Sequence, residues 1–467
     1  MERRPWAKNC DYRPFACTMI ALFIACPVVL GNAYMTFAAG AFRAICLFSF
    51  SIKLFLFLDG ARLYRRDDCQ RTSDGDDLAE FPVYTVLCPL YREKRKTIEQ
   101  LLQSMQNLDY PADKLDLKLI VESDDTPTNG AVRDLHAIHG GFEIVEIPSK
   151  KLKTKPNACN HGLKTARGEF LTIYDAEDRP DRCQLKKAVK AFATLPKDYV
   201  CLQAALKYYN AEENLLTRCF AIEYSMWYDF AIRSLCRMGH FFPLGGNSNH
   251  FRTEKLREYG GWDALNVTED ADIGVVIARS GGRIGHLKSV TFEESPITLK
   301  GWMHQRVRWM KGFMQTFCGH AAHPIRLYRD LGLGNLVVFS VFVLISFFYF
   351  LAFPFIVAMA FLGPKITSLA HSMGFGDPTS YVMPTFFSWD LLTCCALAYI
   401  VFWISVAKNR MRGMLGASLI FTFYWLLHSV ASILALVQLM RNPFVWNKTE
   451  HGLTNEKIGG AADSSDN

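Results

Sequence analysis

Five apolar stretches flank a polar middle along this chain. Two lie near the N terminus, at residues 14–36 and 39–58, and three lie in the last third, near 335–362, 386–407 and 414–439. Each stretch approaches or exceeds the roughly 20 residues that a helix needs to cross a bilayer. The pattern therefore predicts two membrane helices before a soluble central region and three after it.

Within the central region, short β-rich apolar runs alternate with longer polar segments of helical character. The runs cover residues 81–88, 117–121, 142–147, 169–174 and 199–204, and the helical segments cover 93–107, 128–139, 157–166 and 181–194. This alternation predicts an α/β fold in which helices cover both faces of a mainly parallel sheet. Ligands of such sheets bind beyond the carboxyl ends of the strands, so the residues that follow each run are the first candidates for chemistry.

Acidic clusters follow three of these runs. In chain order they contain Tyr91 and Glu93, then Glu122, Asp124 and Asp125, then Asp175, Glu177 and Asp178. A single cluster is equally well explained as a loop or a helix cap, but three at strand ends converge on one crevice. No GxGxxG or Walker pattern is present, so dinucleotide redox chemistry and P-loop hydrolysis lack their signatures. Carboxylates without a phosphate loop favour Mg²⁺ or Mn²⁺, which would bridge the protein and the diphosphate of a sugar nucleotide.

Basic residues predict the orientation in the membrane. Arg3 to Arg13 precede the first apolar stretch and Arg62 to Arg71 follow the second, whereas the link around Thr36 to Gly40 has no Lys or Arg. By the positive-inside rule, the chain is a multi-pass protein of the cell's inner membrane with its central domain in the cytosol. The formal charge of +7 fits these basic flanks, and no Lys/Arg run indicates a nucleic-acid partner. The scattered cysteines, including Cys88 and Cys219, are expected as free thiols.

Three ordered motifs make the chain resemble glycosyltransferase family 2. They are Asp175-Ala-Glu177, Thr268-Glu-Asp270 and Gln305-Arg-Val-Arg-Trp309, each at a spacing similar to that of the family's processive membrane branch of cellulose, hyaluronan and chitin-oligosaccharide synthases. The resemblance covers about residues 80–315 by motif. It implies a GT-A-type, Rossmann-like nucleotide-sugar domain embedded between transmembrane helices.

The resemblance also implies roles for individual residues. Tyr91, Glu93 and Asp124 would bind the uridine, with Glu122 as the alternative to Asp124, and Lys155 would lie near the nucleotide. Asp175 and Glu177 match the metal-binding DxD element, with Glu177 as the direct ligand, and Asp175 and Arg308 would also contact the diphosphate. The acceptor and product would be bound by a further set: Gly246, Asn247, Glu269, Gln305 and Trp309.

Asp270 matches the catalytic base of the family. Inversion at the anomeric carbon needs a carboxylate that removes the proton of the acceptor hydroxyl as its oxygen attacks. A structural alternative stays open, because Thr268 is placed as an N-cap, with Glu269 and Asp270 in the first turn of a helix ending near Gly281-Gly282. Residues 297–318 are likewise explained as an amphipathic interfacial helix, with Arg306 and Lys311 among Trp302 and Trp309.

Five regions follow from these predictions. They are an N-terminal membrane region (1–79), the GT-A domain (80–296), interfacial helices carrying QxxRW (297–332), a C-terminal membrane region (333–440) and a tail (441–467). Residues 443–452 of the tail resemble the mobile loop that covers the active site in cellulose synthases. Three spans after a cytosolic domain would place that lid outside, unless 414–439 lies in the interface or re-enters.

The function expected from the sequence is that of an inverting, metal-dependent hexosyltransferase. It would polymerise UDP-glucose into a β-glucan exopolysaccharide and pass the chain through its own membrane helices, with an accessory export subunit as a further partner. Glucose follows from the family alone. A single transfer to a lipid acceptor is the alternative enzyme, and a transporter with a large cytosolic domain is the alternative from another class.

Overall fold

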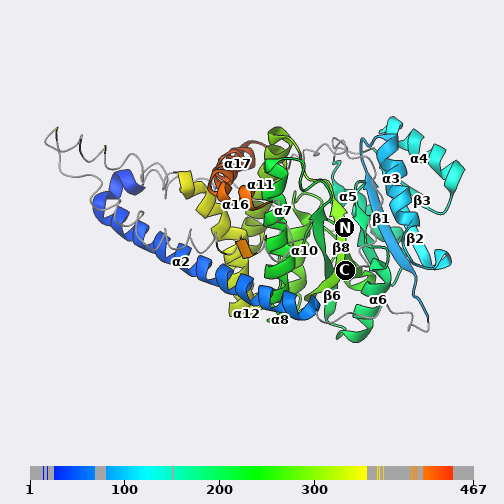
Figure 1. The fold of residues 1–467 in the computed structure, drawn as a ribbon, viewed down its shortest axis with the longest axis horizontal. Helices are drawn as coiled ribbons and strands as arrows, with labels where there is room; N and C mark the ends of the chain where they lie inside the picture. The colour runs from blue at the N-terminus through cyan, green and yellow to red at the C-terminus, as the bar shows by residue number, and fades with distance from the viewer. Residues whose placement is uncertain are drawn as a thin grey trace.

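The computed structural model describes residues 26–68, 80–149, 152–354 and 414–444, with single residues in the intervening segments. Its centre is an eight-stranded sheet of order β3-β2-β1-β4-β7-β6-β8-β5 (Figure 1). The strands are β1 (Tyr84–Leu90), β2 (Leu115–Glu122), β3 (Glu143–Ile147), β4 (Phe170–Ile173), β5 (Arg179–Pro180), β6 (Tyr199–Tyr208), β7 (Asn249–Arg252) and β8 (Arg283–Glu293).

All five predicted strands are present, and β3, β2, β1 and β4 are parallel as expected. The sheet continues differently, because β7 lies antiparallel to both β4 and β6. The sequence analysis missed β7 because its four residues, Asn-His-Phe-Arg, contain only one apolar side chain. It also missed β8, which pairs parallel to β6 along its length.

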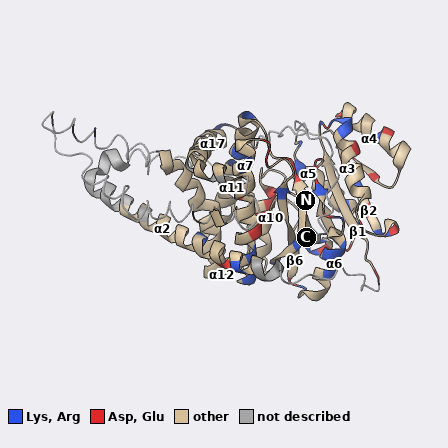
Figure 2. Cartoon of the chain, viewed as in Figure 1, with Lys and Arg blue, Asp and Glu red and all other residues tan. Residues whose placement is uncertain are grey.

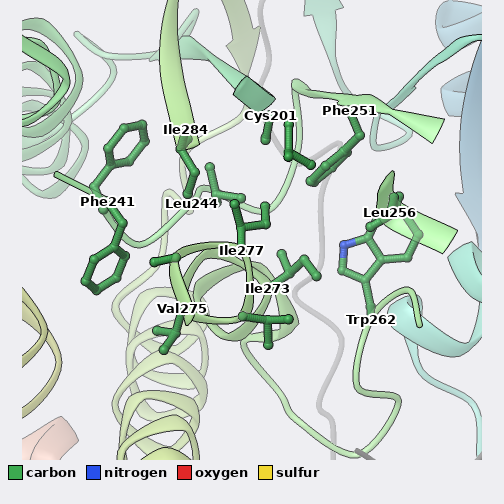
Figure 3. Packing of buried hydrophobic residues seen from close by; sticks show 14 of the residues in the cluster. Cys201, Phe241, Leu244, Phe251, Leu256, Trp262, Ile273, Val275, Ile277 and Ile284 are labelled. Atoms are coloured by element: carbon green, nitrogen blue, oxygen red, sulfur yellow. The ribbon is translucent and has the colours of Figure 1, made fainter. Parts of the chain in front are cut away.

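The four predicted helices of the central region are confirmed as α3 (Arg95–Gln106), α4 (Thr126–His139), α5 (Lys155–Thr165) and α6 (Gln184–Thr194). The following helices are α7 (Leu215–Ser225), the π-helical segment η3 (Met226–Ala231), α8 (Ile232–Arg237), α9 (Thr253–Glu258) and α10 (Glu269–Arg279). α10 is fully apolar on its sheet side: Ile273 and Ile277 pack with Phe251 and Trp262 in the core (Figure 3). This packing fixes the helix whose first turn carries Asp270.

The apolar N-terminal region differs from the predicted pair of helices. A single helix, α2 (Cys26–Asp68), runs through the link expected around Thr36 to Gly40, so no turn separates two spans there. The link, Thr-Phe-Ala-Ala-Gly, contains no proline, and a single glycine costs a helix only about 1 kcal/mol relative to alanine, so the helix can continue through it. The described part of α2 carries almost no charge (Figure 2), and Lys53 Nζ donates to Ser346 Oγ at 3.0 Å. Lys53 is therefore satisfied by an interhelical hydrogen bond.

Three described helices are long and apolar enough to cross a membrane: Gly40–Tyr64, Pro324–Pro354 and Phe423–Arg441. The second comprises α12 (Pro324–Phe339), the π-helical segment η4 (Ser340–Ile345) and the residues that follow. The third lies in α17 (Phe421–Arg441), preceded by the short α16 (Leu415–Leu419). The predicted span at 386–407 and the lid after Phe444 lie outside the described ranges.

Helix α17 runs beside α11 (Leu299–Ala321), and both run in the same direction. Trp302, near the start of α11, packs on Tyr424, near the start of α17, with ring centroids 5.3 Å apart. Further along, Met310 and Met314 of α11 share an apolar cluster with Ala431, Ala435 and Leu439 of α17. The two helices therefore stay together over most of their length.

Candidate active site

A cavity opens at the carboxyl ends of β1, β2 and β4, where the sequence placed the chemistry. Almost every predicted site residue lines it: Tyr91, Glu93, Lys155, Asp175, Glu177, Gly246, Asn247, Glu269, Asp270, Gln305, Arg308 and Trp309. The exception is Asp124. The fold therefore brings together residues that are more than 200 positions apart in the chain.

Glu122, the alternative to Asp124, lines the nucleotide end of the cavity. Its side chain is buried, and burial raises the pKa of the carboxyl. Asp124 instead forms an ion pair with Lys153 and accepts a hydrogen bond from Ser149 Oγ at 3.0 Å. Glu122 and not Asp124 therefore lines the cavity, because β2 ends at Glu122 and Asp124 lies beyond the turn.

The loop after β1 donates two hydrogen bonds to side chains at the start of α4. Arg92 adopts a left-handed backbone conformation with φ 53°, and its N–H donates to Asp125 Oδ2 at 2.5 Å. The N–H of Glu93 donates to Thr128 Oγ1 at 3.0 Å. These bonds place Tyr91 and Glu93 at the cavity rather than against the sheet.

Lys155 begins α5 and points at the predicted metal site. Its Nζ lies 2.5 Å from Asp175 Oδ1 and donates to the carbonyl of Gly246 at 2.9 Å. Burial opposes the charge of Lys155, but Asp175 raises the pKa above its usual value. A buried ammonium at a helix N-terminus suits a phosphate group.

The Asp175 to Asp178 turn concentrates negative charge. Asp178 Oδ2 accepts the N–H of Asp175 at 2.7 Å, which fixes the turn. Burial and the charge of Asp175 together raise the pKa of Glu177 to about 8. Oxygen ligands in a crowded acidic site fit a hard divalent cation. Among the described residues, no three His, Cys, Asp or Glu side chains could hold an ion by themselves. Asp175 and Glu177 could therefore hold a cation that takes its other ligands from a diphosphate and water.

Asp270 lies in the first turn of α10, as the capping alternative requires, but the side-chain hydrogen bond that an N-cap residue makes is missing. Thr268 occupies the N-cap position without a side-chain cap hydrogen bond. Its hydroxyl donates instead to Asn266 Oδ1 at 3.4 Å. Asp270 lines the cavity, and burial raises its pKa. A Cβ built on Gly246 would lie 3.5 Å from Asp270 Oδ2 and 3.8 Å from Lys155 Nζ, so the Gly246 loop runs directly beside both side chains.

Helix α11 has three buried side-chain atoms without a hydrogen-bond partner in the described part of the chain: Gln305 Oε1, Arg306 Nε and Arg308 Nε. Of these residues, Gln305 and Arg308 line the cavity. Arg308 also donates through Nη1 to the carbonyl of Val267 at 3.4 Å. Buried polar atoms without partners are unfavourable, so their presence at a cavity indicates ligand contacts.

Two charged residues of α11, Arg306 and Lys311, do not lie on an exposed polar face of the kind expected for an amphipathic interfacial helix. Arg306 is 3% exposed and makes a two-bond ion pair with Glu223 of α7, at 2.9 and 2.5 Å. Burial would raise the pKa of Glu223, but Arg306 lowers it to about 2. Lys311 is also buried. The helix is therefore docked on the catalytic domain, and its polar residues serve that contact.

The comparison with protein families decides what this arrangement is. The model described as "Glycosyl transferase family group 2" matches residues 170–441, which is more than half of the chain and includes all three motifs. The chain belongs to this family. The family 2 glycosyltransferase domain has the predicted GT-A-type α/β fold, and the enzyme class is confirmed with it.

Known proteins similar to this glycosyltransferase include a bacterial and a plant enzyme. "Probable glycosyltransferase YdaM" of Bacillus subtilis is 23% identical over 85% of this chain and 93% of its own length. "Glucomannan 4-beta-mannosyltransferase 1" of Oryza sativa is 25% identical over 66% of this chain, which spans 60% of the rice protein. The fold is similar to that of the mannosyltransferase PcManGT from Pyrobaculum calidifontis, solved with GDP-Man and Mn²⁺, at a TM-score of 0.53 and 18% identity, covering 86% of this chain and 99% of the other.

The glycosyltransferase cavity also contains residues that the sequence analysis did not assign. They are Lys153, Tyr224, Glu293 and Glu294. Glu293 and Glu294 could have been found from the sequence. They directly follow the apolar run that ends at Phe292, just as the other acidic clusters follow the predicted strands. Tyr224 had no such signal, because it lies within the apolar α7 and reaches the cavity only through the packing of α7 against Trp309.

Proposed function

We propose that the chain is an inverting, metal-dependent processive hexosyltransferase that elongates a β-linked polysaccharide from a nucleoside-diphosphate hexose. One observation carries the proposal: Asp270 lines the same cavity as the Asp175 to Glu177 turn and the Gln305 to Trp309 segment. A carboxylate base, a diphosphate site and an acceptor surface are the three parts that such a transfer needs.

In the proposed reaction, a carboxylate oxygen of Asp270 takes the proton of an acceptor hydroxyl. The hydroxyl oxygen attacks the anomeric carbon of the donor, and the bond from that carbon to the diphosphate breaks with its electron pair on the diphosphate. Lys155 and Arg308 stabilise the negative charge that develops there. A divalent cation held by Asp175 and Glu177 would supply further charge neutralisation.

The donor is UDP-glucose by the sequence argument, and GDP-mannose is the second candidate. The rice relative and the structural neighbour are both named as mannosyltransferases, and the neighbour was solved with GDP-Man and Mn²⁺. The buried Glu122 suits either base, because uracil and guanine both offer ring N–H donors to a carboxylate.

A donor panel tests the proposal. The protein reconstituted in lipid is incubated with radiolabelled UDP-glucose, UDP-N-acetylglucosamine and GDP-mannose, with Mg²⁺ or Mn²⁺, and the product is digested with linkage-specific glycanases. A long β-linked product from one donor supports the proposal. Failure to transfer from every donor would contradict it.

Processivity rests on Trp309 and separates a polymerase from an enzyme that glycosylates a lipid once. The Trp309 ring lies at the cavity beside Tyr224, with ring centroids 6.3 Å apart. An aromatic face can hold a pyranose ring after each addition. Trp309→Ala should therefore shorten the product more than it weakens nucleotide binding. A wild-type product consisting only of monoglycosylated lipid would establish the alternative.

For the membrane arrangement, we propose a cytosolic catalytic domain with α17 lying along the membrane surface. Near its start, Tyr424 Oη donates to Glu223 at 2.8 Å, and just past its end the carbonyl of Pro443 accepts from Gln315 at 2.8 Å. A helix held by the catalytic domain at both ends does not leave that domain by crossing a bilayer. The tail at 441–467 would then begin on the catalytic side, where a lid must be.

Cysteine labelling tests this arrangement. Native Cys159 and Cys201 are buried, so exposed positions are needed, and Ile138→Cys and Phe444→Cys supply them. An impermeant maleimide should label neither in intact cells and both after permeabilisation. Labelling of Phe444→Cys alone in intact cells would show that α17 crosses the membrane.

A further inference from the structure

Glu293 and Glu294 line the catalytic cavity at the end opposite to the nucleoside site. Strand β8 ends at Glu293 and β2 ends at Glu122, and four strands separate β2 from β8 in the sheet. At a strand spacing of about 4.8 Å, five steps correspond to roughly 24 Å. The two ends of the cavity therefore meet different parts of the reacting molecules.

Asn247 leaves one buried acceptor atom open beside these carboxylates. Its Nδ2 donates to Asp178 Oδ1 at 2.8 Å and to Glu293 Oε2 at 3.1 Å. Because both bonds need N–H donors, they fix the orientation of the amide. Asn247 is 2% exposed, and its Oδ1 has no partner among the residues that the structure describes. An unpaired buried acceptor is unfavourable, so this atom indicates a ligand that donates a hydrogen bond.

Other residues that line the cavity also offer hydrogen-bond acceptors, and so favour a ligand that donates hydrogen bonds. Gln305 Oε1 is a second cavity-lining acceptor without a partner in the described chain. Carboxylates accept hydrogen bonds and, when ionised, cannot donate them. A ligand with several O–H groups satisfies these acceptors.

An aromatic surface lies next to the acceptors. Tyr224 lines the cavity and stacks with Trp309 at an interplanar angle of 23°. Glu293 lines the same cavity as this pair of rings. Carboxylates for hydroxyl groups and an aromatic face for C–H groups are together suited to a pyranose.

We infer that Glu293, supported by Asn247, binds hydroxyl groups of the acceptor sugar and determines which acceptor the enzyme extends. This inference rests on the proposed function. The acceptor is favoured over the donor hexose because Asn247, which donates to Glu293, belongs to the loop that the sequence assigns to the acceptor. Trp309, the proposed acceptor platform, lines the same cavity as Glu293.

Glu293→Gln tests the inference with little change of shape. The glutamine oxygen can still accept from Asn247, but its other atom becomes an N–H donor where the ligand expects an acceptor. The KM for cellotetraose or mannotetraose, whichever the wild type extends, should rise about tenfold or more. The KM for the donor and the dissociation constant of the nucleoside diphosphate should not change. Glu258→Gln, on the exposed face of α9, is the charge-matched control and should change neither KM.

An unchanged acceptor KM would overturn the inference. A rise in the donor KM, with slower donor hydrolysis when no acceptor is present, would also overturn it, because Glu293 would then contact the donor sugar. Should Glu293→Gln lose nucleotide binding, Tyr224→Leu provides the second test, and a normal acceptor KM in that variant would refute the site. Absence of any transfer by the wild type is a separate result that removes the proposed function itself.

Discussion

Gln315 joins the end of α17 to the chain segment that carries Asp270. Its Nε2 donates to the carbonyl of Pro443 at 2.8 Å, and its Oε1 accepts the N–H of Val267 at 3.2 Å. Gln315 is buried, and Val267 directly precedes the Thr268 to Asp270 motif. One side chain therefore couples the proposed interfacial helix to the position of the proposed base.

Gln315→Leu is expected to lower both stability and transfer. The substitution leaves the buried N–H of Val267 unpaired, at a cost of about 1–3 kcal/mol. It also removes the donor to the half-buried carbonyl of Pro443. Thermal unfolding in detergent should show a lower Tm, and transfer should fall while nucleotide binding persists. Gln315→Glu keeps the acceptor for Val267 and should retain more transfer than Gln315→Leu. Equal transfer by the two variants would show that the Val267 bond does not position Asp270.

Asp270→Asn should fold and bind nucleoside diphosphate but lose transfer by roughly a hundredfold or more, because general-base catalysis contributes about that much. Isothermal titration with UDP and GDP gives the binding, and radiolabel incorporation gives the transfer. Near-normal turnover would show that Asp270 is not the base and that its carboxylate only stabilises the first turn of α10.

Removal of divalent metal should abolish transfer, and Glu177→Ala should weaken the metal dependence of nucleotide binding. The reason is that a carboxylate pair without a phosphate loop cannot by itself neutralise a leaving diphosphate. Activity is measured across a Mn²⁺ titration after chelation. Full activity in the presence of EDTA would show that transfer does not need a metal. Lys255→Ala, on the surface of α9, is the control variant and should leave the Mn²⁺ titration unchanged.

Transfer should decline on acidification at a higher pH than an exposed aspartate would cause. Burial raises the pKa of Asp270 above its ordinary 3.8, and a base works only when deprotonated, so activity is present above the raised pKa and lost below it. Burial and the Asp270 charge raise the pKa of the adjacent Glu269 to about 7. Because Glu269 is then largely protonated on the acid side of pH 7, Glu269→Gln should leave in place an acid limb of kcat that Asp270 sets. A limb that moves or disappears in this variant would show that the ionisation of Glu269, and not that of Asp270, limits the rate.

The sequence by itself determined the α/β alternation, the enzyme family and most of the candidate site. Strands with period-two or continuous apolar runs and helices with 3.6-residue periodicity are local patterns, and a parallel sheet places the following residues at one edge. For this reason Tyr91, Asp175 and Glu177 could be assigned before any contact was known. Asp270 and Trp309 came from motif resemblance, and their side chains do meet at the cavity.

Tertiary structure decided what local patterns cannot contain. Glu122 rather than Asp124 lines the cavity because β2 ends at Glu122 and because Asp124 forms an ion pair with Lys153. The short β7 is too polar to show a strand pattern and exists because β4 and β6 both pair with it. The sequence placed Arg306 on an amphipathic interfacial helix. Its side chain is buried instead, because an ion pair with Glu223, 83 positions earlier in the chain, offsets the cost of its desolvation. Such contacts join groups that are distant in the chain, and only the packed fold determines which of them meet.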